Sequence, residues 1–247
     1  MTTPTPNPTA AMLVIGDEIL SGRTTDANLV HLAHELSEAA IELKEVRVVA
    51  DDHDDIVAAV RALSARWDHI FTSGGIGPTH DDITAEAIAG AFGVAIDVRD
   101  DARALLGAYY RRNNVEFNAA RMRMARIPEG AVLIDNPISV APGFTLGNVH
   151  VMAGVPAIFC AMVASVLPTL MGGAPMLSRS FRIDRPEGDF AAELAEIALL
   201  HQRVAIGSYP FVLNGHFGSN IVFRSIEAAA LDLAAEAFCM AFPMARK

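Results

Sequence analysis

Short apolar runs alternate with helix-like patterns along the first two thirds of the chain. Residues 12–15 form a buried-strand pattern that stops at Gly16, and apolar residues after Asp26 recur at the 3.6-residue helical period. Strand patterns return at 46–49 and 69–73, and a helical pattern follows each of them. Strands and helices in alternation predict a largely parallel sheet that is covered by helices on both faces.

The pattern changes after a stretch rich in glycine and proline at 169–175. Before it, helical patterns at 101–112 and 118–126 and short strands near Val132 and Phe144 predict a mixed edge of the sheet. After it, the order strand, helix, strand, strand, helix predicts a small two-layer α+β domain. We therefore predict a flexible tail at 1–10 and a larger domain at 11–170. A linker at 171–177 connects it to a smaller domain at 178–247.

Composition narrows the class of protein. Among 247 residues, 52% are hydrophobic, which is enough for a sizeable core, and the formal net charge is −10. A chain this acidic is a poor general binder of nucleic acid, which requires clustered cations. Cys160 and Cys239 lie in apolar stretches without metal-ligand spacing, and we find no apolar run long enough for a bilayer. We expect a cytoplasmic protein without nucleic-acid or membrane partners.

The strongest local signal is the sequence Gly74-Gly75-Ile76-Gly77-Pro78-Thr79 between a strand and a helix. Such a turn exposes backbone N–H groups beside a helix start, where the helix dipole adds partial positive charge. It lacks the lysine of a Walker loop, and His80 stands where a dinucleotide fingerprint has its third glycine. Two interpretations stay open: a tight turn, or a cradle for an anion.

Aspartates follow two of the predicted strands. Asp81 and Asp82 stand where the next helix begins, and Thr79-x-x-Asp82 fits a capping box. A carboxylate beside a phosphate cradle can instead hold a hard cation. Asp51 follows the second strand, at the sheet edge where parallel sheets bind ligands, or it simply caps the helix after it.

Further polar turns lie at the same predicted edge. Ser21 and Gly22 are positioned to contact a ligand, and Asp26 can cap a helix or bind a polar group. Turn-rich pieces recur at 137–144 and 153–156. Five arginines between positions 111 and 126 form a local basic cluster that is either solvated or in reach of a substrate phosphate: Arg111, Arg112, Arg121, Arg123 and Arg126.

Taken together, these segments resemble the molybdopterin-binding domain family, closest to the N-terminal domain of competence/damage-inducible protein A. The resemblance covers residues 11–170 and rests on several ordered motifs, which together are far more specific than one glycine loop. They are Ile15-Gly16-Asp17-Glu18-Ile19-Leu20-Ser21-Gly22, Asp26-x-Asn28, Gly74-Gly75-Ile76-Gly77-Pro78-Thr79-x-Asp81-Asp82-Ile83-Thr84, Asn136-Pro137, Ala141-Pro142-Gly143-Phe144 and Gly154-Val155-Pro156.

The resemblance implies a three-layer α/β/α fold with a mainly parallel mixed sheet and a homo-oligomer, a dimer or trimer. In molybdopterin adenylyltransferases the glycine loop holds the pterin phosphate, and two aspartates, matching Asp51 and Asp82, assist Mg²⁺-dependent AMP transfer. The competence/damage-inducible branch looks like metal-dependent hydrolases of nucleotide diphosphates such as ADP-ribose or FAD. The motif Gly-Pro-Thr-x-Asp-Asp-Ile-Thr in this chain is closer to that branch than to the adenylyltransferases.

We therefore expect a nucleotide or pterin ligand and a divalent cation (Mg²⁺, Mn²⁺ or Co²⁺) held by Asp51 and Asp82, which would also be the catalytic residues. Molybdopterin is an alternative ligand, and AMP transfer or binding without chemistry are alternative functions. The positions expected to contact the ligand are Asp17, Ser21, Gly22, Asp26, Gly74, Gly75, Ile76, Gly77, Thr79, Pro142, Gly143 and Gly154.

Overall fold

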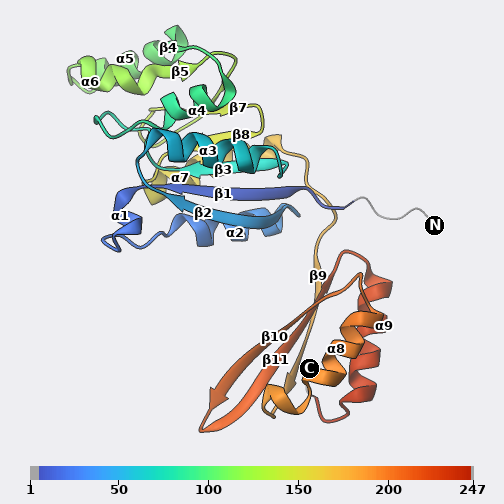
Figure 1. Ribbon diagram of the computed structural model, residues 1–247. Helices are drawn as coiled ribbons and strands as arrows, with labels where there is room; N and C mark the ends of the chain where they lie inside the picture. Colours follow the sequence, from blue (N-terminus) through green and yellow to red (C-terminus); the bar gives the residue numbers. More distant parts are fainter. Residues whose placement is uncertain (1–5, 246–247) are drawn as a thin grey trace. The chain divides into compact units, whose positions relative to one another are not determined.

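A mixed sheet forms the centre of the larger part of the molecule. The structure is a computed structural model that describes residues 6–245, and these divide into two compact units at Gly173/Ala174 (Figure 1). The sheet has six strands in the order β2-β1-β3-β8-β7-β6. Its strands are β1 (Thr9–Ile15), β2 (Glu42–Val49), β3 (His69–Ser73), β6 (Val132–Ile134), β7 (Gly143–Leu146) and β8 (Val149–Met152).

Strand directions confirm the predicted mainly parallel mixed sheet. β2, β1, β3 and β8 pair in parallel, whereas β7 and β6 pair antiparallel at one edge. The four parallel strands end at the same edge of the sheet, because parallel strands run in one direction. Residues that follow β1, β2, β3 and β8 therefore meet there, and this edge is where the candidate site lies.

Alternate side chains of β1 enter two different cores, as the twofold period of a strand dictates. One face buries Ala11, Leu13 and Ile15 with residues of α3 (His53–Ser64), α4 (Thr84–Phe92) and α5 (Asp100–Arg112). The other buries Ala10, Met12 and Val14 with residues of α2 (Asn28–Glu38) and α7 (Pro156–Val166). Helices on both faces of a central sheet form the predicted three layers (Figure 1).

The region before β6 departs from its predicted structure. We expected one helix at 118–126, but α6 (Ala119–Met122) ends early and a 3₁₀ turn, η1 (Arg123–Ala125), follows it. Arg126 instead begins β5 (Arg126–Pro128), which pairs antiparallel with β4 (Ile96–Val98), a strand that the sequence pattern missed. Tertiary pairing therefore overrides the local helical pattern at this point.

Two predicted boundaries shift. The predicted tail 1–10 is too long, because β1 begins at Thr9 and the side chain of Asn7 is buried, whereas residues 1–5 lie outside the described part. The predicted linker 171–177 is too long as well. Gly173 donates a hydrogen bond to the Ala40 carbonyl, and a Cβ on Gly172 would lie 2.2 Å from the Ala39 carbonyl oxygen. Both glycines therefore pack on the larger unit.

The smaller unit is the predicted α+β domain. An antiparallel sheet in the order β10-β11-β9 comprises β9 (Leu177–Ile183), β10 (Ala205–Leu213) and β11 (His216–Ser225). It packs on α8 (Ala191–Leu200) and α9 (Ala228–Ala241) through a core that includes Phe181, Phe223 and Phe238. Asn214 and Gly215, both at positive φ, connect β10 to β11, as an Asn-Gly hairpin turn requires.

The remaining short elements are α1 (Asp17–Leu20), η2 (Leu167–Thr169) and η3 (Glu187–Asp189).

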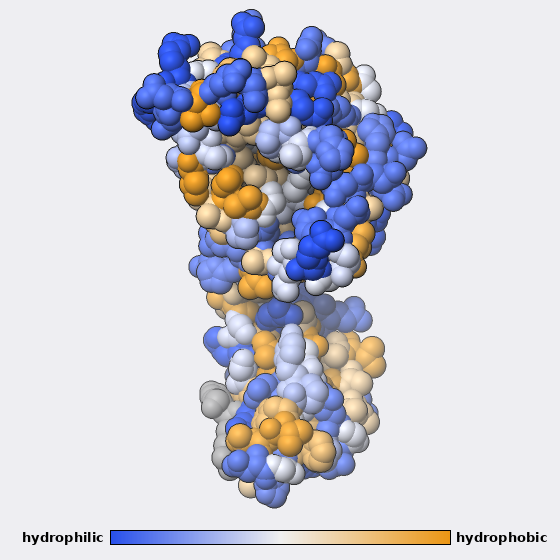
Figure 2. Space-filling view, turned by 90° about the vertical axis from the view of Figure 1, so that its left-hand side faces the viewer, coloured by the Kyte–Doolittle hydropathy of each residue, from blue (hydrophilic) through white to orange (hydrophobic). Residues whose placement is uncertain are grey.

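Within residues 6–245, no helix combines the length and the apolar character that crossing a bilayer requires. Hydrophilic and hydrophobic residues are intermixed on the face of the molecule that Figure 2 shows.

Two histidines lie side by side on β3 and β8. Nδ1 of His69 is 3.3 Å from Nε2 of His150, and Nδ1 of His150 is 3.0 Å from Oγ1 of Thr145. Phe71 covers His150, with 4.9 Å between ring centroids. Burial, helped by the neighbouring His69, lowers the pKa of His150 to about 4, and burial also lowers the pKa of His69. His150 is therefore neutral in the folded protein at pH 7.

We predict that acidification destabilises the fold through His150. The unfolded chain binds a proton near pH 6.5 and the folded chain only near pH 4, so the free energy of unfolding falls as pH drops through that window. The loss attributable to His150 is about 2 kcal/mol between pH 7.5 and 5. Urea unfolding should show a shallower pH dependence for His150→Asn and an unchanged one for the exposed His34→Asn. The same pH dependence of the unfolding free energy in the wild type and both variants would contradict the assignment to His150.

Candidate anion-binding site at the strand ends

The loop after β3 adopts a conformation that glycine alone permits. Gly74 has φ 112° and Gly75 has φ 67°, both in the region that L-residues avoid. A Cβ on Gly74 would lie 2.2 Å from the carbonyl oxygen of Ile15, and a Cβ on Gly75 would lie 2.1 Å from Oγ1 of Thr84. The absence of side chains therefore allows the loop to lie directly against β1 and the start of α4.

Thr84 fixes this loop from the first residue of α4. Its hydroxyl donates a hydrogen bond to the Gly74 carbonyl at 3.0 Å, and its N–H donates one to the Gly75 carbonyl at 3.0 Å. On the other side, the Gly74 N–H donates to the Met152 carbonyl at 3.2 Å. Thr84 is fully buried, so these bonds are shielded from water. The loop is thereby held to both α4 and β8.

Three consecutive N–H groups of the loop have no internal acceptor. Within residues 6–245, the main-chain N–H groups of Gly75, Ile76 and Gly77 donate no hydrogen bond, whereas those of Gly74 and Thr84 do. Successive unpaired N–H groups beside a helix start attract an anion, because their dipoles add to that of the helix. This geometry supports the anion-cradle interpretation of the motif over that of a tight turn alone.

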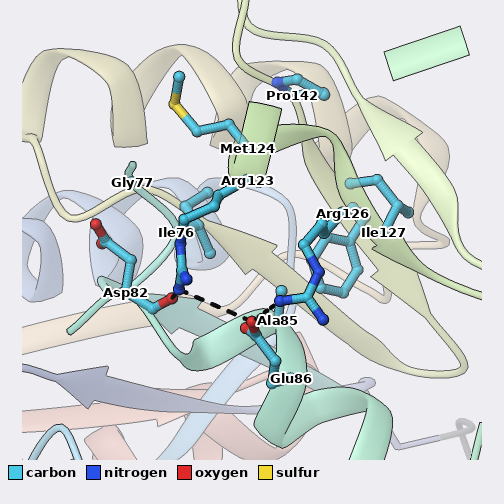
Figure 3. A pocket seen from close by; sticks show the side chains of 12 residues that line it. Ile76, Gly77, Asp82, Ala85, Glu86, Arg123, Met124, Arg126, Ile127 and Pro142 are labelled. Atoms are coloured by element: carbon cyan, nitrogen blue, oxygen red, sulfur yellow. Dashed lines mark hydrogen bonds and ion pairs between the residues drawn. The ribbon is translucent and has the colours of Figure 1, made fainter. Parts of the chain in front are cut away.

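A small pocket opens beside the loop, and two arginines line it (Figure 3). Arg126 forms an ion pair with Glu86 of α4, and Nη2 of Arg123 lies 3.9 Å from the same carboxylate. The lining residues are Gly75, Ile76, Gly77, Asp82, Ala85, Glu86, Arg123, Met124, Arg126, Ile127, Pro142 and Phe144. Two of the five clustered arginines thus lie next to the cradle, and the carboxylates of Glu86 and Asp82 line the same pocket.

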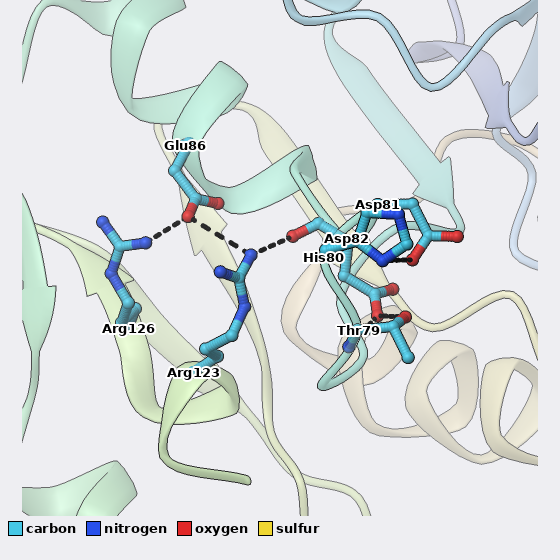
Figure 4. Close-up of polar contacts among 7 residues, drawn as sticks. All are labelled: Thr79, His80, Asp81, Asp82, Glu86, Arg123 and Arg126. Carbon is cyan, nitrogen blue, oxygen red and sulfur yellow. Dashed lines mark hydrogen bonds and ion pairs between the residues drawn. The ribbon is translucent and has the colours of Figure 1, made fainter. Parts of the chain in front are cut away.

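Asp82 is engaged by its own loop (Figure 4). Its Oδ2 accepts a hydrogen bond from the Thr79 N–H at 2.8 Å and one from the Thr79 hydroxyl at 2.5 Å. Because α4 begins at Thr84, two residues later than we predicted, this pair closes a turn ahead of the helix and is not a capping box of it. Nη2 of Arg123 donates to the Asp82 carbonyl at 3.2 Å.

Asp51 lies at the end of β2 among other acidic residues. One of its carboxylate oxygens accepts the Asp17 N–H at 3.0 Å. Burial raises its pKa, the negative charges of Asp17, Glu18 and Asp81 raise it further, and the Asp17 N–H opposes them. The structure therefore places Asp81 in electrostatic reach of Asp51, whereas Asp82 bonds to Thr79. Asp51 does not line the pocket of Figure 3.

Carboxylate oxygens, which are hard donors, lie at this edge, but they do not form a complete metal site. Within residues 6–245, no group of three or more His, Cys, Asp or Glu side chains is placed to hold a metal ion. Any cation held by one or two of these carboxylates would need water or a ligand to complete its coordination, as Mg²⁺ commonly does.

The other expected ligand positions divide between the site and the scaffold. A Cβ on Gly154, after β8, would lie 3.2 Å from Cα of Gly74, so the two loops touch. Gly22 is exposed and has open space around it, and the Ser21 hydroxyl donates to the Glu18 carbonyl at 3.3 Å.

Asp26 and Gly143 have structural partners. The Asp26 carboxylate accepts the Leu29 N–H at 2.7 Å, which favours the capping interpretation of Asp26. Gly143 begins β7, where a Cβ would lie 2.4 Å from the Val151 carbonyl oxygen. Pro142, by contrast, lines the pocket beside the cradle. Sequence position alone did not separate these roles.

Asn28 has a positioning role that sequence reasoning did not assign. It is 3% exposed, and its Nδ2 donates to the Ser73 hydroxyl at 2.7 Å and to the Gly154 carbonyl at 2.8 Å. It therefore ties the start of α2 to the ends of β3 and β8, on either side of Gly74. An amide side chain at the buried face of a helix start is the signal that could have identified it.

Fold and loop together define an α/β domain with a candidate anion site at the carboxyl ends of its strands. Residues 11–172 match the family described as "Probable molybdopterin binding domain", and residues 175–246 match "FAD synthase, middle domain". The chain belongs to the molybdopterin-binding domain family, which confirms the resemblance drawn from its motifs.

Relatives agree with this assignment. A CinA-like protein of Desulfosudis oleivorans is 37% identical over 69% of this chain, and a Pyrobaculum aerophilum protein is 34% identical over 81% of it. The crystal structure of CinA from Thermoplasma acidophilum covers 67% of this chain and 99% of its own, with 30% identity and a TM-score of 0.61.

A Caldivirga maquilingensis protein is 36% identical over 65% of this chain. The chain spans 64% of the Caldivirga protein and 79% of the Pyrobaculum protein, but only 43% of the Desulfosudis one.

We predict that Gly75→Ala destabilises the fold far more than Gly93→Ala. Both glycines have nearly the same φ, 67° and 69°, but a Cβ on Gly93 meets nothing within 4 Å. Gly93→Ala should therefore cost only the left-handed backbone penalty, about 1–2 kcal/mol. Gly75→Ala should cost about 2 kcal/mol more, because it displaces Thr84 and its bond to Gly74. Urea unfolding measures both, and equal losses would show that Thr84 does not constrain the loop.

Proposed function

We propose that the chain binds the phosphate of a nucleotide or pterin at Gly75–Gly77 and hydrolyses the pyrophosphate bond of a nucleotide diphosphate such as ADP-ribose or FAD. The observation that carries this proposal is the set of three consecutive loop N–H groups without an internal acceptor. A phosphate offers several acceptor oxygens and a negative charge, which suits such a set. The fixed backbone of the loop means that little reorganisation accompanies binding.

Two guanidinium groups beside the loop support a diphosphate over a single phosphate. Arg123 and Arg126 line the pocket beside Gly77, together with the carboxylates of Glu86 and Asp82. A second phosphoryl group next to the cradle would therefore meet guanidinium groups that can bind its oxygens in pairs. Charge that develops on the phosphoryl oxygens during bond cleavage would meet the same donors.

Carboxylates at this edge support a divalent cation as part of the proposal. Asp51 and Asp82 each use one carboxylate oxygen in a hydrogen bond and retain another, and these are the hard donors that Mg²⁺ or Mn²⁺ prefers. Asp51 and Asp82 would hold the cation, with phosphate oxygens completing its coordination, and Asp81 lies close enough to add negative charge. The bound cation would neutralise charge on the phosphoryl oxygens. The raised pKa of Asp51 is consistent with a site that a positive charge would stabilise.

Two alternatives share this geometry. AMP transfer to molybdopterin would use the same cradle with a different acceptor, and the description of the matched family names molybdopterin as a ligand. Binding of a pterin or nucleotide without turnover would need the cradle and none of the carboxylates. Assembly into a dimer or trimer is part of the same proposal, and light scattering of the purified protein would test it.

We predict that Asp51→Asn lowers metal-dependent turnover about 100-fold or more, because a cation would lose one of its carboxylates. The assay follows ADP-ribose, FAD, and molybdopterin with ATP, each with Mg²⁺, Mn²⁺ or Co²⁺ and with EDTA. Asp54→Asn is the matched control, because it removes the same charge from an exposed position in the same acidic run. It should leave turnover within twofold of the wild type.

The outcomes separate the alternatives. Turnover of a diphosphate only with a metal supports hydrolysis, and adenylylated molybdopterin supports transfer. A ligand that raises the melting temperature but is recovered intact supports binding alone. Full turnover in Asp51→Asn would remove the carboxylate from the mechanism.

A further inference from the structure

The carboxylate of Asp82 occupies donors that a phosphate would need. Thr79 lies at the far end of the glycine loop, and both its N–H and its hydroxyl donate to one oxygen of Asp82, at 2.8 and 2.5 Å. The Asp82 carboxylate is an oxyanion, as a phosphate is, and it accepts charge-assisted hydrogen bonds in the same way. In this structure the loop therefore already binds an anion of its own (Figure 4).

The Asp82 carboxylate also lies against the loop itself. A Cβ on Gly77 would be 2.6 Å from Oδ2 of Asp82, so only a glycine leaves room for the carboxylate there. Gly77 is one of the three residues whose N–H is unpaired. An incoming phosphate at that N–H would thus approach a negative charge at short range, and like charges at such distances repel strongly.

The main chain of Asp82 is held by contacts other than those of its side chain. Arg123 donates to the Asp82 carbonyl at 3.2 Å, and the Asp82 N–H donates to the Thr79 carbonyl at 3.3 Å. Arg123 faces Glu86, which is paired with Arg126 (Figure 4). Release of Thr79 therefore needs rotation of one side chain and no rearrangement of the loop.

We infer that Asp82 is an internal competitor that blocks phosphate binding until a cation offsets its charge; this rests on the proposed function of the loop. Without a cation, the carboxylate holds Thr79 and repels the ligand. With a cation, the carboxylate turns away from Thr79 and the ligand gains both donors. The same residue that would help to hold the cation thereby prevents the cradle from retaining phosphates without one.

Binding of ADP-ribose in EDTA tests this inference by calorimetry. Asp82→Asn removes the charge and keeps the shape, and we expect its affinity in EDTA to exceed that of the wild type at least fivefold. Glu18→Gln is the matched control: it removes one carboxylate charge near Asp51 at the same edge of the sheet, and the Thr79 N–H and hydroxyl donate to Asp82 and not to Glu18. Its gain should be at least threefold smaller. Equal gains in both variants, or weaker binding by Asp82→Asn, would overturn the inference.

A second measurement needs no ligand. In Asp82→Ala the Thr79 N–H loses its acceptor, so its hydrogen exchange measured by NMR should be at least fivefold faster than in the wild type, and Glu18→Ala should stay within twofold. Unchanged exchange in Asp82→Ala would show that the contact does not hold Thr79 in solution. If the wild type binds no ADP-ribose even with Mg²⁺ while the exchange result is as expected, the proposed function fails and the Asp82–Thr79 contact stands.

Discussion

The site depends on the absence of two side chains between β3 and its neighbours. At Gly74 and Gly75 a Cβ would lie 2.2 and 2.1 Å from Ile15 and Thr84, distances that no real contact tolerates. Because the loop can lie this close, Thr84, the first residue of α4, reaches both glycine carbonyls. The N–H groups of Gly75, Ile76 and Gly77 in the same loop donate no hydrogen bond within residues 6–245. The candidate anion site thus depends on a packing constraint.

Most of the larger fold was predictable, because its signals are local. The apolar run of β1 indicates a strand that is buried on both faces, and its alternate residues enter the two cores. The parallel order follows from strands and helices that alternate along the chain. The strand pair β4 and β5 was not predictable, since Arg126 belongs to a helical pattern that only long-range pairing interrupts. Likewise, Gly172 and Gly173 are typical of a linker, and only their contacts with residues 39 and 40 show that they pack on the larger unit.

The candidate site was predictable in its residue types but not in its pairings. Sequence position placed Asp51 and the glycine loop at one edge, and the structure agrees with that placement. Asp82 accepts the Thr79 N–H, whereas Asp81 lies in electrostatic reach of Asp51, and a one-residue choice between them depends on side-chain geometry. Asn28 was missed for the same reason, since its two partners lie 45 and 126 residues away.

The most direct test of the account is an NMR titration of the wild-type protein with ADP-ribose in the presence of Mg²⁺. The account predicts that the amide protons of Gly75, Ile76 and Gly77 shift downfield and exchange more slowly, because they acquire phosphate acceptors. Amides of the smaller unit, such as those of β9, should stay unchanged. Binding that leaves these three resonances in place while others move would contradict the central claim.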